Sequence, residues 1–204
     1  MGIALRFARA GVRVVVGSRS LDKARDAVAA SRSRWGELPL EAAENEGAIA
    51  GCETVFLAVP FDTVAAIITA HGHRFTAGAL AVDITVPVSF AKGKPELTFT
   101  EESAAQRIRS LLPASVALAC AFKTIPAHTL AQLDEPLDCD DLVCGDTPES
   151  RSRIVDLVRL IPGLRPIDAG PLDAARTLER MTLLAIGINR RYKVHAARFR
   201  VVGV

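Results

Sequence analysis

The sequence predicts an α/β protein with a doubly wound parallel sheet, and three observations lead to this fold class. Two runs of β-branched and apolar residues, 12–16 and 54–59, lack polar alternation, which is typical of strands buried on both faces. Segments with a helical pattern, roughly 10–15 residues long, separate such runs, as in βαβ units. Half of the 204 residues are hydrophobic, so the chain can form a sizeable core.

The elements expected in the first half of the chain follow from apolar spacing and from glycine and proline. Gly11, Gly51 and Pro60 each end an element, because glycine caps helices and proline interrupts strands. Asp83 and Pro87 indicate a turn after the last strand of this half. The expected helices are 3–10, 22–33, 41–50 and 63–70, and the expected strands are 12–16, 54–59 and 79–82.

The second half has shorter strands and ends in a long helix. Pro148 stands in the first turn of one helix, where its missing N–H group is not needed. The expected helices are 103–112, 148–160 and 172–191, the expected strands are 116–119, 142–144 and 165–168, and 92–100 is expected to be a loop. The change in spacing after residue 113 predicts a nucleotide-binding domain over 1–113 and a small substrate-side lobe over 114–204.

The turn after the strand 12–16 carries Ser18, Arg19 and Lys23, and its chemistry indicates which nucleotide binds. In this kind of fold a strand that binds NAD ends in Asp or Glu, whose carboxylate accepts hydrogen bonds from the ribose 2′-hydroxyl. Basic and hydroxyl side chains instead suit a 2′-phosphate. The turn therefore predicts binding of NADP(H).

Overall charge and cysteine content narrow the class of protein. A net charge of +2 is too small to suggest a nucleic-acid partner. No apolar run long enough to span a membrane and no signal peptide is found, so a cytoplasmic protein without a membrane partner is expected. The four cysteines lack the spacing of zinc sites or of a disulfide framework, and we expect free thiols. His71 and His73 lack further ligands, so no metal site is expected.

Charged residues are distributed unevenly along the chain. Residues 134–149 contain seven acidic and no basic side chains, whereas residues 176–204 contain seven Lys and Arg against Glu179 alone. Two interpretations are open: both segments are solvated surface, or the basic end meets a polyanion through electrostatic steering.

Ligands of open α/β sheets bind outside the carboxyl ends of the strands, which here are 17–19, 58–61, 83–87 and 122–126. These segments are largely apolar, which suits a nicotinamide ring and a flat partner better than hydrolysis, although packing alone also favours apolar loops. Asp83 is interpreted as a turn carboxylate. Lys123, alone in an apolar loop, is either an anion contact or a side chain that reaches out to solvent.

Several longer motifs add to this pattern. They are Val-Val-Gly-Ser-Arg at 15–19, Ala-Val-Pro at 58–60, Val-Pro at 86–87, Thr-Ile-Pro-Ala at 124–127, Val-Cys-Gly-Asp at 143–146 and Gly-Leu-Arg-Pro-Ile-Asp-Ala-Gly-Pro-Leu at 163–172. Through them the chain resembles, over nearly its whole length, the NADPH-dependent reductases of the deazaflavin coenzyme F420, also called F420-dependent NADP oxidoreductases. The segment Ile-Asn-Arg-Arg-Tyr-Lys at 188–193 is similar to the ending of the bacterial branch.

The resemblance implies a Rossmann-like fold and direct hydride transfer between NADP(H) and coenzyme F420. Such a transfer needs proximity and stacking but no acid, base or nucleophile, so no catalytic residue is expected. The implied cofactor contacts are Ser18, Arg19 and Lys23 at the 2′-phosphate and Val59, Thr63, Val86 and Ala127 along the rest of the cofactor; the implied substrate contacts are Lys123 and Ala197. Archaeal members tend to have His where this chain has Lys123.

Members of this family begin with a strand and a glycine-rich loop, whereas this chain begins with Met1-Gly2, at the start of the following helix. We expect about 13 residues of the family pattern to be absent, by the usual length of a strand and that loop. In the strand order of such sheets, the first strand lies between the strands 12–16 and 54–59. These two strands are therefore expected to face a gap.

Two other functions stay open at this point. One is a reductase of the same fold that uses NADPH to reduce a flavin, a quinone or a metal. The other is a non-catalytic nucleotide-binding protein. The apolar positions of the final helix also indicate a homodimer surface; these are Leu178, Met181, Leu184 and Ile188.

Overall fold

The computed structural model describes residues 1–91, 94–99 and 101–204, and in them the strands form three sheets. β1 (Val14–Ser18) pairs in parallel with β2 (Leu40–Glu44). The main sheet has the order β3-β4-β7-β8-β9. Its strands are β3 (Thr54–Leu57), β4 (Leu80–Asp83), β7 (Ala117–Cys120), β8 (Cys139–Gly145) and β9 (Leu164–Pro171). The α/β class is confirmed, but one pair departs from the expected parallel sheet, because β8 runs antiparallel to β7.

The helices fall largely where apolar spacing predicts them. They are α1 (Gly2–Arg9), α2 (Leu21–Trp35), α3 (Asn45–Ala50), α4 (Phe61–His71), α5 (Ala104–Leu111), α6 (Ala127–Ala131), α7 (Pro148–Arg159) and α8 (Ala175–Tyr192), with 3-10 turns η1 (Gly72–Arg74) and η2 (Leu172–Ala174). Two of them start with a capping box, α5 through Ser103 and α7 through Thr147. Within the described residues, no helix combines the length and the apolar character that crossing a bilayer would need.

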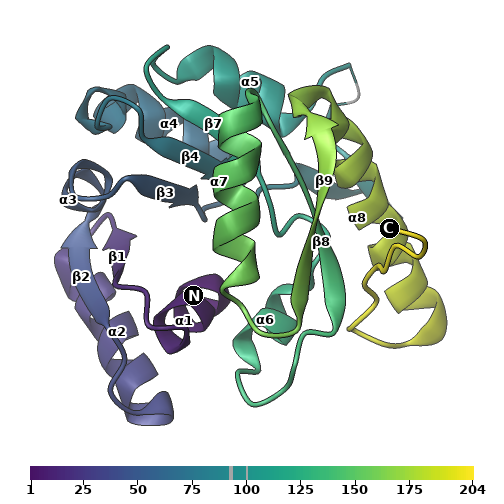
Figure 1. The fold of residues 1–204 in the computed structure, drawn as a ribbon, viewed down its shortest axis with the longest axis horizontal. Helices are drawn as coiled ribbons and strands as arrows, with labels where there is room; N and C mark the ends of the chain where they lie inside the picture. The colour runs from purple at the N-terminus through teal and green to yellow at the C-terminus, as the bar shows by residue number, and fades with distance from the viewer. Residues whose placement is uncertain (92–93, 100) are drawn as a thin grey trace.

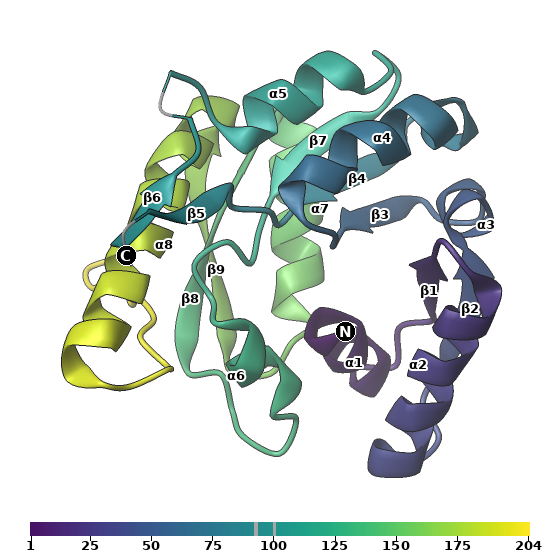
Figure 2. The same ribbon diagram turned by 180° about the vertical axis from the view of Figure 1, so that it is seen from behind.

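The main sheet is covered on both faces, which explains its uninterrupted apolar strands. Successive side chains of β4 point to opposite faces, so Ala81 packs in one core cluster and Leu80 and Val82 in the other. Figure 1 shows α7 in front of the sheet, and Figure 2, from behind, shows α4 and α5 across the opposite face. The sheet is therefore doubly wound, as the sequence predicts.

Helix α1 connects the β1–β2 sheet and the main sheet. Its Leu5 and Ala8 pack in the core of the β1–β2 sheet, whereas Phe7 stacks on the main sheet, with its ring centroid 5.4 Å from that of Phe56. Its Arg6 is buried and donates four hydrogen bonds of 2.7–3.1 Å to carbonyl oxygens at and after the end of α6. These contacts fix α1 against both parts of the fold.

Two expected elements are wrong in part. The helix expected over 41–50 begins only at Asn45, because residues 40–44 pair with β1 as a strand, and sheet pairing overrides the helix propensity of Ala and Glu. The loop expected over 92–100 contains β6 (Lys94–Leu97), which pairs antiparallel with β5 (Val88–Ala91); residues 92, 93 and 100 lie outside the described part. The short helix α6 was not anticipated either.

The main sheet combines strands from both halves of the chain. β4 pairs with β7, so the boundary expected at residue 113 divides one continuous sheet. Among the described strands, β1 pairs with β2 and β3 with β4, and no ladder joins β1 to β3. These two strands therefore belong to separate sheets, in agreement with the expectation that no strand lies between them.

Candidate functional site

The carboxyl ends of the parallel strands form one edge of the main sheet. The register aligns Leu57, Asp83 and Cys120 across β3, β4 and β7, so the segments that follow these strands leave the sheet side by side. Most of the residues that the sequence indicates as ligand contacts lie on these segments. This edge is where a flat ligand would meet the protein in an open α/β sheet.

The turn between β1 and α2 presents free positive charge. Arg19 and Lys23 are both exposed, and among the described residues neither forms an ion pair. Asp22, the acidic residue of the same turn, lies 3.6 Å from Arg25 instead. The N-terminus of α2 adds its own partial positive charge. The turn therefore has the side chains and the backbone orientation to hold a phosphate group.

The expected contacts along the rest of the cofactor follow β3, β4 and β7. Val59 and Val86 are half-buried, and Thr63 lies in the first turn of α4, where its N–H donates to Pro60 O. Ala127 begins α6 and is exposed. All four positions thus lie at the same edge of the sheet, on three separate segments.

Ala197 lies apart from the strand ends, in the tail that follows α8. Its N–H donates to Asn189 Oδ1 over 2.9 Å, which holds this part of the tail against the end of the helix. The rings of His128 and His195 are 6.3 Å apart, so the tail passes close to the start of α6. The structure thereby brings the neighbourhoods of Ala197 and Ala127 together.

Lys123 does not reach out to solvent. Its side chain is 0% exposed, and its ammonium donates to Asp83 Oδ2 at 2.7 Å and to the carbonyl of Thr85, with Glu179 Oε1 at 3.3 Å. Burial alone would lower the pKa of Lys123, but the negative charges of Asp83 and Glu179 outweigh it and raise that pKa above its ordinary value. The amine is thus a permanent buried cation, and its role as a substrate contact stays a prediction.

Asp83 forms the turn that the sequence predicts. Its Oδ1 accepts hydrogen bonds from the Thr85 N–H at 2.8 Å and from the Thr85 hydroxyl at 2.7 Å. Its Oδ2 is the oxygen that binds Lys123. One carboxylate therefore shapes the segment that leads to Val86 and also neutralises the buried lysine.

A second buried carboxyl group, that of Asp141, shapes the segment after β7. Both of its oxygens lie within 3.0 Å of the Phe122 N–H, and Phe122 has a left-handed backbone with φ 56°. Burial raises the pKa of Asp141 to about 8. This contact turns the chain directly before Lys123.

Sequence reasoning missed Glu179, Thr182 and Asp141. Glu179 lies four residues after the buried Ala175 of α8, on the side of the helix that faces the core, and Thr182 donates from the same helix to Lys123 O at 2.8 Å. A carboxylate at an apolar position of an amphipathic helix is the signal that could have revealed Glu179. Asp141 had no such signal, because it stands within an acidic stretch.

Some residues of the acidic stretch 134–149 contact the basic end 176–204. Asp140 is buried and pairs with Arg165 at 2.8 Å, a contact that lowers the pKa of Asp140, and Asp138 pairs with Arg200 at 2.8 Å. Asp140 also accepts the N–H of Val201. The interpretation as solvated surface is therefore wrong for Asp140, whereas Asp138 and Arg200 form an exposed pair, as that interpretation expects.

Two buried polar atoms near this edge lack a partner among the described residues, Thr124 Oγ1 and Glu179 Oε2. An unpaired buried donor or acceptor is costly, about 1–3 kcal/mol. Polar atoms of a bound ligand would offset that cost. The residues at the edge thus fit a ring system with polar groups at its rim.

Comparison with known proteins extends this picture to the whole chain. A family model described as "NADP oxidoreductase coenzyme F420-dependent" matches residues 1–87. The F420-dependent NADP reductase of Methanothermobacter thermautotrophicus is 33% identical, with 100% of this chain and 90% of that protein aligned. That of Methanocaldococcus jannaschii is 32% identical, over 100% of this chain and 93% of that protein.

The fold of a solved structure agrees. The crystal structure of a candidate F420-dependent NADP-reductase from Arthrobacter sp. FB24 superposes with a TM-score of 0.83, at 21% identity, over 99% of this chain and 94% of that one. The family expected from the sequence motifs is confirmed by the two methanogen relatives. The chain belongs to the family of F420-dependent NADP reductases.

Proposed function

We propose that this protein is an oxidoreductase that transfers a hydride between NADP(H) and coenzyme F420. One observation carries the proposal: the likeness to the methanogen reductases covers the whole chain, including residues 114–204. A nucleotide-binding half is shared by many dehydrogenases, whereas the second half is where the deazaflavin would be held. We therefore keep the division into 1–113 for the nucleotide and 114–204 for the second ring as a functional proposal.

The free cations at the β1–α2 turn support the assignment of the nucleotide. Arg19 and Lys23, with the Ser18 hydroxyl, would hold the 2′-phosphate, since charged hydrogen bonds to phosphate are strong and directional. Val59, Thr63, Val86 and Ala127 would line the path of the cofactor towards the second ring. Ala197 and the segment after Lys123 would contact the deazaflavin.

The reaction needs little chemistry from side chains. In one direction a C–H bond of NADPH breaks, the hydrogen and its electron pair add to the deazaflavin ring, and a proton from water completes the reduction. The protein contributes alignment of two flat rings and exclusion of water. Lys123 is the ionisable residue that the sequence indicates near the second ring, and its buried ion pairs suit a structural cation better than a proton donor.

The test combines a cofactor assay with a charge-removal variant. Mixing the protein with NADPH and F420 should bleach the visible absorbance of the oxidised deazaflavin, and flavin or quinone acceptors should react much more slowly. In Arg19→Ala/Lys23→Ala the preference for NADPH over NADH should fall by roughly tenfold or more, since each lost charged hydrogen bond is worth about 1.5–3 kcal/mol. Arg25→Ala is the matched control, because Arg25 is also exposed on α2 but pairs with Asp22.

The outcomes separate the possibilities. No bleaching with any preparation of the wild-type protein would refute the proposed acceptor, and faster reduction of a flavin, quinone or metal would favour that class instead. Binding of NADPH without turnover of any acceptor would identify a non-catalytic protein. An unchanged NADPH preference in the double variant would refute the 2′-phosphate assignment alone.

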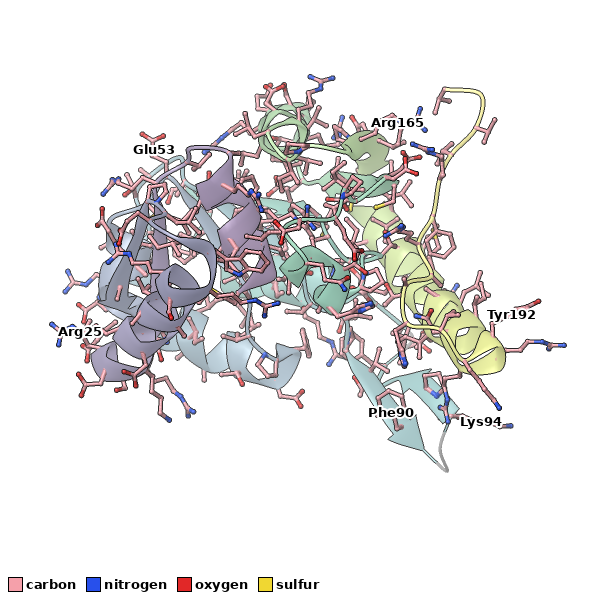
Figure 3. All side chains as sticks on the ribbon, turned by 90° about the horizontal axis from the view of Figure 1, so that it is seen from below. Arg25, Glu53, Phe90, Lys94, Arg165 and Tyr192 are labelled. Carbon is pink, nitrogen blue, oxygen red and sulfur yellow. The ribbon has the colours of Figure 1, made fainter. Side chains whose placement is uncertain are left out.

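We also propose a homodimer in a reducing cytoplasm. All four cysteines are free thiols, which suits that compartment. Leu178 is buried within the protein, but Leu184 is 56% exposed on α8, and Phe90 and Tyr192 project outward from the hairpin and the helix beside it (Figure 3). β6 packs on α8, so these side chains belong to one side of the protein. We propose no nucleic-acid partner.

A further inference from the structure

Three charged side chains meet inside the protein at the edge where the ligands are proposed to bind. Lys123 lies between Asp83, at 2.7 Å, and Glu179, at 3.3 Å, and each of the three side chains is at most 1% exposed. They come from β4, from the segment after β7 and from α8. No other pair of oppositely charged side chains in the described residues is buried to this degree on both sides.

A gain in folding stability does not by itself explain this cluster of charged side chains. Removing three charges from water is expensive, and apolar side chains of similar volume often stabilise a fold as well or better. In addition, Glu179 Oε2 has no hydrogen-bond partner among the described residues, so the cluster is not saturated. An arrangement of this kind is better explained by the geometry that it imposes than by the free energy of unfolding.

The geometry that it imposes is that of the two segments proposed to face the rings. Every polar group of Thr85 is held: its N–H and hydroxyl by Asp83, and its carbonyl by the Lys123 ammonium. Thr85 directly precedes Val86, a proposed cofactor contact. The segment 83–87 therefore has little freedom to move relative to Lys123.

The same cluster fixes the other segment to α8 and α5. Glu179 accepts the N–H of Ala104, the first residue of α5, and the Thr182 hydroxyl donates to Lys123 O. On its other side, Asp141 holds Phe122 in its left-handed conformation. The start of the segment that leads to Ala127, residues 122 and 123, is thus anchored from two sides.

We propose that Asp83 and Glu179 are positioning residues for hydride transfer, which act through Lys123 to set the spacing between the segments 83–87 and 123–127. This inference rests on the proposed function. Neither carboxylate touches the reacting rings. Because transfer requires the two reacting carbons in near contact, a displacement of about 1 Å can cost roughly a hundredfold in rate. Because the 2′-phosphate would be held at the β1–α2 turn, which neither carboxylate contacts, the affinity for NADPH should change much less than the rate.

The test uses Glu179→Gln and Asp83→Asn, which keep the size of each side chain and can still accept the N–H of Ala104 or of Thr85. We expect the single-turnover rate of hydride transfer from NADPH to F420, at saturating concentrations, to fall roughly 10–100-fold. The Kd of NADPH, measured separately by fluorescence titration, should change less than about threefold. Asp146→Asn is the matched control: it weakens the 2.9 Å pair with Arg109 at the opposite edge of the sheet, and its rate should stay that of wild type.

Each outcome is decisive. Rates of both variants equal to that of Asp146→Asn, or a loss that lies wholly in the Kd of NADPH, would overturn the positioning role. If Asp83→Asn does not fold, as judged by circular dichroism, Glu179→Gln decides, because Glu179 makes the longer of the two ion pairs. A wild-type protein that does not reduce F420 at all would instead refute the proposed function itself.

Discussion

The buried carboxyl group of Asp141 gives the sharpest prediction about stability. Burial raises its pKa to about 8, whereas the same group in the unfolded chain titrates near 3.8. Between these values the native protein keeps a proton that the unfolded chain has released. The free energy of unfolding therefore falls as the pH rises through this interval, by at most about 1.4 kcal/mol per pH unit for one proton.

Asp141→Asn removes this dependence while leaving an oxygen to accept the Phe122 N–H. The difference in unfolding free energy between variant and wild type should rise with pH, by about 2.7 kcal/mol between pH 5 and pH 7 at the limit of one full proton. Urea unfolding at a series of pH values measures it. The exposed Asp134→Asn makes the same chemical change at the surface, and its difference from wild type should stay constant. A constant difference for Asp141→Asn as well would show that Asp141 is ionised in the native protein and would refute the reasoning.

Three further predictions concern packing and reactivity. Arg6→Met removes four hydrogen bonds to backbone carbonyl oxygens, two of them buried, and should lower the free energy of unfolding by about 3–5 kcal/mol in urea. The exposed Arg9→Met should cost about 1 kcal/mol or less, and equal losses would contradict the role of Arg6. In Gly145→Ala the new methyl group would overlap Ser150 Oγ and lie 3.2 Å from Leu118 O, so the free energy of unfolding should fall by about 1–3 kcal/mol. In Gly187→Ala the methyl group would meet nothing within 4 Å inside α8, and the free energy of unfolding should rise by about 0.5–1 kcal/mol. Thermal unfolding should show a lower melting temperature for the first variant and a higher one for the second. A thiol reagent should modify Cys52 in the native protein and the other three cysteines only after unfolding, since Cys52 is partly exposed and those three are buried; modification of two or more thiols in the native protein would contradict that burial.

How far the sequence predicts this protein depends on whether the deciding contact is local. The strands at 14–18 and 54–57 and the helix that begins at Pro148 follow from side chains next to them along the chain, and all were predicted within a few residues. The strand at 40–44 was not, because its pairing with β1 is a contact over more than twenty residues that overrides helix propensity.

The residues of the candidate site show the same difference between local and long-range contacts. The turn with Ser18, Arg19 and Lys23 could be predicted because the residues that determine its chemistry are neighbours along the chain. The surroundings of Lys123 could not, since its partners lie 40 and 56 positions away along the chain. A lone lysine in an apolar loop indicates that some partner must exist, but only the fold identifies Asp83 and Glu179.

The absence of a ladder between β1 and β3 has a consequence for motion. Segment 12–50 is joined to the rest mainly through side chains of α1 and α3, so it can separate from the main sheet without breaking any strand pairing. Such units open at a lower free energy than global unfolding and exchange their amide hydrogens sooner. A nucleotide that contacts both Arg19 and Val86 would bridge the two parts, and amide protection in 12–50 should then increase on binding NADPH. The cofactor would thus link the two sheets to each other in addition to donating the hydride.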